Sequence, residues 1–108
     1  MKTGDIILIP FPFAELKEVK VRPAVVITET ADKYKDLVIS AISSVVPDSL
    51  DPNEILINPN PANKLRVQSV IKVDRIVTLK QKDKIADLGK LSASEIVVFK
   101  KIFTDLVK

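Results

Sequence analysis

The groups in this sequence that are best suited to chemistry are cations, hydroxyls and a carboxylate on apolar, strand-like stretches. They are Lys20, Arg22, Arg66, Lys72, Ser43, Ser44 and Asp74. A guanidinium keeps its proton and presents several donors in one plane, which suits it to phosphate or carboxylate. If these groups converge, they would hold a phosphodiester, deprotonate a ribose 2′-hydroxyl and stabilise the charged transition state. Such a cleavage needs no metal and selects RNA over DNA.

Each of these candidates also has an ordinary structural interpretation. Arg22 is able to pair with an acid such as Asp5 at a strand edge. The hydroxyl of Ser43 is able to bond to its own sheet. Lys72 and Asp74 are able to form an ion pair, since alternate residues of a strand share a face. The spacing of the residues leaves these interpretations open.

The composition limits the chemistry that is available. The chain has 108 residues, of which 46% are apolar and 29% charged, and this indicates one globular domain spanning residues 1–108. The sequence contains neither Cys nor His, which excludes thiolate and imidazole metal sites, Cys nucleophiles and His acid-base catalysis. We expect no metal and no cofactor. The apolar runs are short and the start is no signal peptide, so we expect a cytoplasmic protein without membrane contact.

Several short stretches are typical of β-strands. Ile6–Ile9 should stop or bend at Pro10, because proline lacks a backbone donor. The other expected strands are Arg22–Thr28, Leu37–Val46, Glu54–Ile57 and Leu65–Leu79. The last is too long to run straight, so we expect a kink near Asp74 to Arg75.

The C-terminal part of the sequence has the pattern of a helix and not of a strand. Gly89 is expected to close a short turn or helical piece. Ser92 and Glu95 have capping-box spacing, and Ile96, Phe99 and later apolar residues then recur at helical intervals. The sequence therefore predicts a mainly β fold with helices (α+β): a small, SH3-like, partly open barrel of five to seven strands with a C-terminal helix lying on it.

Five stretches, taken in order, resemble the MazF/PemK toxins of type II toxin-antitoxin systems. They are Gly4–Phe13, Arg22–Ile27, Ser40–Ser43, Ser69–Ile71 with Asp74 and Thr78, and Gly89–Ser92. The resemblance covers nearly the whole chain. It implies a homodimer that cleaves single-stranded RNA at short sequences without the ribosome, and a cognate antitoxin that fills the RNA-binding groove.

The resemblance also implies roles for individual residues. Arg22 matches the family's catalytic arginine, Ser43 stands where many members have a catalytic threonine, and Asp74 matches a proposed base. Lys72 stands in place of an arginine and loses its planar fork. The candidate RNA-binding residues are Lys17, Lys20, Ser44, Gln68 and Lys72. Ser43 and Ser44 are alternatives for the pocket hydroxyl, because a one-residue change of register exchanges their faces.

Two other functions stay open at this point, because a fold does not fix a function. The first is a non-enzymatic toxin like CcdB, which binds DNA gyrase. The second is a catalytically silent member that binds RNA or buffers antitoxin. The oligomeric state also has two readings. A two-fold partner would cover exposed strand edges, whereas a helix that covers the whole apolar face would leave a monomer.

Overall fold

A computed structural model describes residues 1–11 and 20–107. The described residues form one six-stranded antiparallel sheet followed by a C-terminal helix, as the sequence predicted. The elements are β1 (Asp5–Phe11), β2 (Lys20–Glu29), β3 (Leu37–Ser43), β4 (Glu54–Ile57), β5 (Ser69–Leu79), a 3-10 turn (Gln81–Asp83), β6 (Ala86–Lys90) and α1 (Ala93–Asp105).

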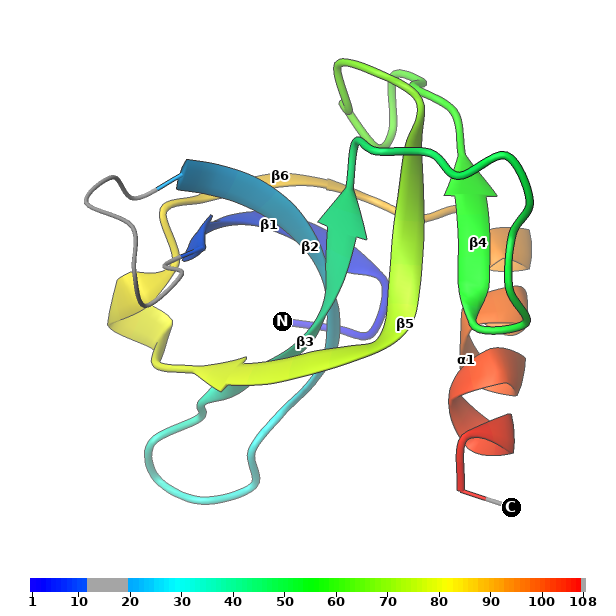
Figure 1. Ribbon diagram of the computed structural model, residues 1–108. Helices are drawn as coiled ribbons and strands as arrows, with labels where there is room; N and C mark the ends of the chain where they lie inside the picture. Colours follow the sequence, from blue (N-terminus) through cyan, green and yellow to red (C-terminus); the bar gives the residue numbers. More distant parts are fainter. Residues whose placement is uncertain (12–19, 108) are drawn as a thin grey trace.

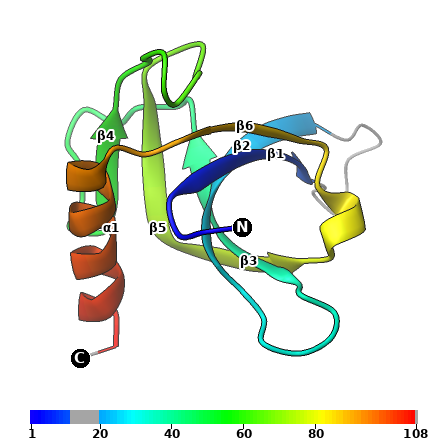
Figure 2. The same cartoon turned by 180° about the vertical axis from the view of Figure 1, so that it is seen from behind.

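The sheet curls into a half-barrel. Its strand order is β4-β5-β3-β2-β1-β6, so the two edges are β4 and β6. In Figure 1 the strands β1, β2, β3 and the long β5 curve around one side of the molecule, and α1 stands beside β4 at the other. The view from behind shows β6 running along β1 before the chain enters α1 (Figure 2). This curl brings strands that are distant in sequence next to one another.

Side chains of alternate strand residues build two separate cores. On β2, Val25 and Ile27 belong to the larger cluster, which includes Phe99 of α1. Ala24 and Val26 belong to a second cluster on the other face, together with residues of β1 and β3. Burial on both faces explains why these strands read as continuous apolar runs. Arg22, two residues before Ala24 on the same face of β2, therefore lies at the end of this second cluster.

The long strand bends where the sequence predicted. Ser40 of β3 pairs with Ile76 of β5, but the next residue, Ala41, pairs with Lys72. Residues 73 to 75 are therefore extra on β5, and they form a bulge that includes Asp74 and Arg75. The buried Ser40 hydroxyl donates to the Val73 carbonyl at 2.9 Å, so a side chain satisfies one polar group of the irregular stretch.

Several expected strand boundaries are wrong. β5 begins at Ser69 and not at Leu65, and β2 runs from Lys20 to Glu29, beyond both ends of the expected Arg22–Thr28. β1 continues through Pro10, which pairs with Val21, because β6 accompanies β1 only as far as Leu8 and leaves that side an edge. β3 ends at Ser43, whereas we expected a strand reaching Val46. Past Ser43 the chain turns away from β5, so the apolar Val45 has no strand partner and is exposed. The strand at Glu54–Ile57 has the predicted bounds.

Gly89 also differs from expectation, because it lies within β6 and pairs with Ile6. A side chain at this position would collide with the carbonyl oxygens of Ala62 and Asn63. Glycine here permits a close approach of two backbone segments. A lone glycine in the sequence does not distinguish this role from a turn.

The start of α1 follows the predicted capping box. The Ser92 hydroxyl accepts the Glu95 amide at 3.2 Å, and the Glu95 carboxylate accepts the Ser92 amide at 2.8 Å. Phe99 is buried, and Ile96, Ile102 and Phe103 pack on the same cluster. The helix therefore lies on the barrel, as expected. No helix among the described residues has the length and apolar character needed to cross a membrane.

Candidate active site

Backbone register brings Arg22 and Ser43 to one face of the sheet. Ala24 of β2 pairs with Ala41 of β3 in antiparallel strands. Arg22 lies two residues before Ala24, and Ser43 lies two residues after Ala41. The two side chains therefore lie on the same face as this pair. Directly paired residues point to the same face. Ser43 in turn pairs with Val70 of β5, which puts an apolar residue beyond the hydroxyl. A cation and a hydroxyl thus lie on neighbouring strands.

Arg22 is half-buried and has few internal contacts. Its guanidinium donates one hydrogen bond, at 3.3 Å, to the Val21 carbonyl. Among residues 1–11 and 20–107 no carboxylate lies within 4.0 Å of it. Asp5 instead accepts the Lys2 amide, so the pairing of Arg22 with Asp5 is not formed. The remaining guanidinium donors are available to an anion from solution.

The two serines are separated by the end of β3. Ser43, the last residue of the strand, shares the face of Arg22, and its hydroxyl oxygen accepts the Val45 amide at 3.1 Å. Its proton is therefore still available for donation. Ser44 follows the strand and is exposed at the rim of the pocket described below. Register thus favours Ser43 as the partner of Arg22.

Lys72 pairs with an acid that sequence reasoning did not single out. It lies opposite Ala41 on the face of Arg22, and its ammonium group contacts the Glu54 carboxylate of β4 at 3.0 Å. The Glu54 side chain is only 7% exposed. Its other oxygen accepts the Asp51 amide at 2.9 Å, and this bond, followed by the bond from Lys72, holds the pKa of Glu54 below its usual value. The positive charge of Lys72 is largely compensated.

Asp74 is not brought to the same place as Arg22 and Ser43. It is exposed in the bulge of β5, and its carboxylate accepts a long hydrogen bond, at 3.5 Å, from the Asn53 side-chain amide. Val70, which is level with Ser43, lies four residues earlier, so extended geometry separates the two positions by roughly 10 Å or more. The expected ion pair between Lys72 and Asp74 is absent, since Lys72 contacts Glu54.

The other predicted RNA-binding residues are scattered. Lys20 is exposed at the start of β2, two residues from Arg22. Gln68 precedes β5, and its amide nitrogen donates to the Asn58 side chain at 2.7 Å. Lys17 lies outside the described residues. Among the described residues no group of three potential metal ligands occurs.

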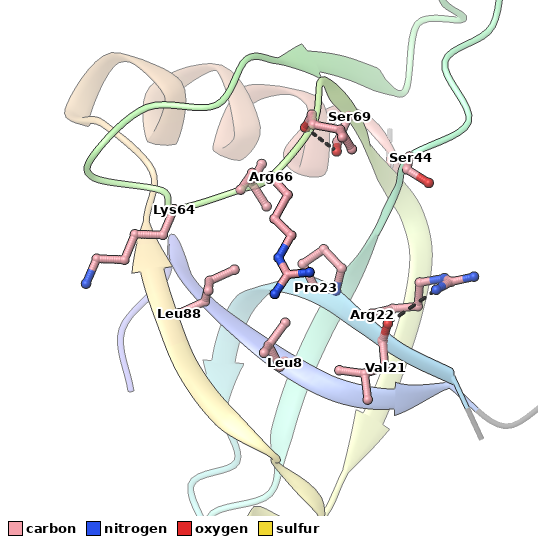
Figure 3. A pocket seen from close by; sticks show the side chains of 11 residues that line it. Leu8, Val21, Arg22, Pro23, Ser44, Lys64, Arg66, Ser69 and Leu88 are labelled. Carbon is pink, nitrogen blue, oxygen red and sulfur yellow. Dashed lines mark hydrogen bonds between the residues drawn. The ribbon is translucent and has the colours of Figure 1, made fainter.

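A pocket of about 430 Å³ opens beside Arg22, on the far side of Pro23. Figure 3 shows the Arg66 side chain reaching over it toward Leu8 and Leu88, while the Arg22 guanidinium points away. Its other lining residues are Val21, Pro23, Ser44, Lys64, Leu65, Val67 and Ser69. Sequence reasoning included Arg66 among the cations but missed Lys64, Leu8 and Leu88. No local pattern predicts them, because the pocket joins segments that meet only in the folded sheet.

Comparison with known proteins places this geometry in a family. Residues 2–104 match the family described as "PemK-like, MazF-like toxin of type II toxin-antitoxin system". The chain belongs to this family. Among curated proteins no sequence matches it.

Three solved structures have the same fold. An endoribonuclease in complex with its cognate antitoxin from a mycobacterial species is 12% identical, with a TM-score of 0.73, 99% of this chain covered and 94% of that one. The Mycobacterium tuberculosis toxin MazF-mt6 is 17% identical, with a TM-score of 0.69 and 95% of each chain covered. MazF from Deinococcus radiodurans is 19% identical, with a TM-score of 0.72, 99% of this chain covered and 96% of that one. The half-barrel with a C-terminal helix is thus a MazF fold.

Proposed function

We propose that this MazF/PemK family member is a toxin that cleaves single-stranded RNA at short sequences, independently of the ribosome. The observation that carries the proposal is the shared face of Arg22 and Ser43 on neighbouring strands. A guanidinium without an internal carboxylate partner and a hydroxyl with a free proton are suited to a phosphodiester. Similarity to a mycobacterial endoribonuclease and to two MazF toxins supports the same activity.

The reaction that fits these groups uses the substrate's own 2′-hydroxyl. The 2′ oxygen attacks the adjacent phosphorus, the bond from phosphorus to the 5′ oxygen breaks, and the products are a 2′,3′-cyclic phosphate and a 5′-hydroxyl. The 2′-hydroxyl loses its proton and the leaving 5′ oxygen gains one. Arg22 stabilises the extra negative charge on the phosphorane, and Ser43 donates a hydrogen bond to the phosphate or holds the 2′-hydroxyl.

Asp74 fits this reaction less well as a base. Its displacement along β5 from Arg22 and Ser43 favours contact with a flanking nucleotide. Lys20 is exposed near Arg22 and is suited to attracting the RNA backbone. Lys72 contributes less attraction, because Glu54 compensates its charge.

We also propose two protein partners for the chain. One is a cognate antitoxin that covers Arg22 and Ser43, in line with the antitoxin complex of the mycobacterial relative. The other is a second copy of the chain, because β4 and β6 are the two edge strands of the described sheet and a two-fold partner is the commonest cover for such edges. Cytoplasmic location follows from the same proposal, since messenger RNA and antitoxin are found there.

The proposal is tested by incubating the purified protein with a long mixed-sequence RNA in EDTA and mapping the new ends. We expect cleavage at a short consensus, with cyclic phosphate and 5′-hydroxyl ends. A matched RNA with a 2′-deoxy sugar at one mapped site should stay intact at that site. Intact RNA throughout would contradict the proposal and favour a CcdB-like or silent toxin. Cleavage at the deoxy position would contradict the 2′-hydroxyl mechanism.

A further inference from the structure

The pocket beside Arg22 combines an apolar surface with the positive charge of the Arg66 guanidinium. Its charged lining residues are Arg22, Lys64 and Arg66, and among the described residues no acid lines it. Six apolar residues, among them Leu8 and Leu88, form most of its surface. A volume of about 430 Å³ is within the range of small-ligand sites. Such a lining is complementary to a ligand with a flat apolar body attached to an anion, as in one nucleotide of a single strand.

Arg66 is the residue in this pocket that is able to recognise a base. Among the described residues its guanidinium has no carboxylate within 4.0 Å, and the side chain is exposed. Figure 3 shows the guanidinium beside Leu88 and above Leu8, inside the pocket. Its planar donors would therefore face the edge of any base lying on those leucines. Lys64 points away from the pocket in the same view and is suited to a neighbouring phosphate.

The donors of Arg66 select among purines by their chemistry. A guanidinium donates and never accepts, so it matches an edge with two adjacent acceptors. Guanine presents its O6 and N7 in this way, whereas adenine presents N7 beside an amino group that would oppose the donors. In a single strand this edge is free of pairing and open to a side chain.

We propose that Arg66 is a specificity-determining residue, which holds a guanine of the RNA in the pocket over Leu8 and Leu88. The inference rests on the proposed function. Arg22 lines this pocket and also belongs to the row with Ser43, so the guanine belongs to a nucleotide adjoining the cleaved phosphate. Lysine at position 66 would keep the charge but lose the paired donors.

The test compares the cleavage-site consensus of four proteins on one mixed-sequence RNA. The wild-type chain should enrich guanine over adenine by about tenfold at one fixed position. Arg66→Ala and Arg66→Lys should both lose this enrichment and still cleave. Arg75→Ala, which removes an exposed arginine outside the pocket, should keep it. No guanine enrichment in the wild type, or enrichment that persists in Arg66→Ala, would overturn the inference.

A binding measurement tests the role of Arg66 independently of RNA cleavage. The probe is a fluorescent uridine oligonucleotide with one central guanosine or one central adenosine, titrated with wild type and Arg66→Ala. A guanosine preference that requires Arg66 supports the inference even if no RNA is cleaved. Equal affinity for the two probes overturns it even if cleavage is found. Loss of antitoxin binding alone, with both RNA results unchanged by the substitution, would assign Arg66 to the antitoxin and overturn it too.

Discussion

At the residue scale, Glu54 and Lys72 join the edge strand β4 to β5 through an ion pair at 3.0 Å. The Asp51 amide and the Lys72 ammonium lower the pKa of Glu54 from its usual 4.5, so the folded state favours the ionised carboxyl. A carboxyl whose folded pKa is depressed stabilises the protein above its unfolded pKa. This contribution is lost as the pH falls from about 4.5 through the lower folded pKa.

Glu54→Gln should therefore flatten the dependence of stability on pH below about 4.5. Glutamine still accepts the Asp51 amide, so the substitution removes mainly the charge. The measurement is the urea midpoint at neutral pH and at acidic pH. Asp48→Asn, at an exposed site, controls for the loss of one negative charge. If Glu54→Gln and wild type lose stability in parallel on acidification, the ion pair contributes nothing.

The two arginines near the site have different surroundings, and these suit different tasks. Arg22 is half-buried at the end of the second core cluster, which fixes where its guanidinium emerges. Arg66 is exposed on the segment before β5 and reaches across a pocket. A cation in a fixed position is suited to stabilising the charge that develops in a transition state. An extended arginine with paired donors is suited to hydrogen bonding with the edge of a base.

At the element scale, α1 depends on the reciprocal bonds of Ser92 and Glu95. Ser92→Ala should destabilise the protein by about 1 kcal/mol, because the Glu95 amide loses its acceptor. For a domain of this size that corresponds to a melting temperature lower by about 4 to 8 °C. Ser94→Ala is the matched control: it removes only the exposed contact between the Ser94 and Ser92 hydroxyls at 3.2 Å and leaves the acceptor of the Glu95 amide in place, so stability should change little. Equal melting temperatures for the two variants would contradict the role of the cap.

Sequence predicted the elements whose signals are local. The capping box, the strand at Glu54–Ile57 and the bend near Asp74 all depend on neighbouring residues, and all three are present. The predictions made from proline and glycine were wrong where the local structure depends on a strand that is distant in sequence. Pro10 is tolerated because β6 stops short of it, and Gly89 is required by the approach of residues 62 and 63. Neither fact is contained in a local window of sequence.

The candidate site was predictable only in part, for the same reason. Arg22 and Ser43 share a face through the pairing of β2 with β3, which resemblance to a family implied and spacing did not. The pairing of Lys72 with Glu54 depends on β4 lying at the edge beside β5, and alternation within one strand suggested Asp74 instead. The pocket residues Leu8 and Leu88 meet across β1 and β6, and nothing in either segment alone indicates a cavity.

At the scale of the whole molecule, one end of the half-barrel carries the groups that chemistry on RNA requires. Arg22, Ser43 and the pocket with Arg66 gather where β2 begins and β3 ends. The chain has a mild net charge of +3, and in the described part of the structure no acid lines the pocket, so the local charge there is positive. The buried clusters below hold the strands in the register that this arrangement needs.

The proposed cleavage depends above all on Arg22 acting at the cleaved phosphate. Its most direct test is the rate of RNA cleavage at a mapped site, measured in EDTA for wild type, Arg22→Ala and Arg75→Ala. We expect Arg22→Ala to be slower by about a hundredfold or more, as for the loss of a donor to a developing oxyanion. Arg75→Ala should cleave at the wild-type rate, and all three proteins should melt alike. Cleavage by a folded Arg22→Ala protein at the wild-type rate would contradict the account.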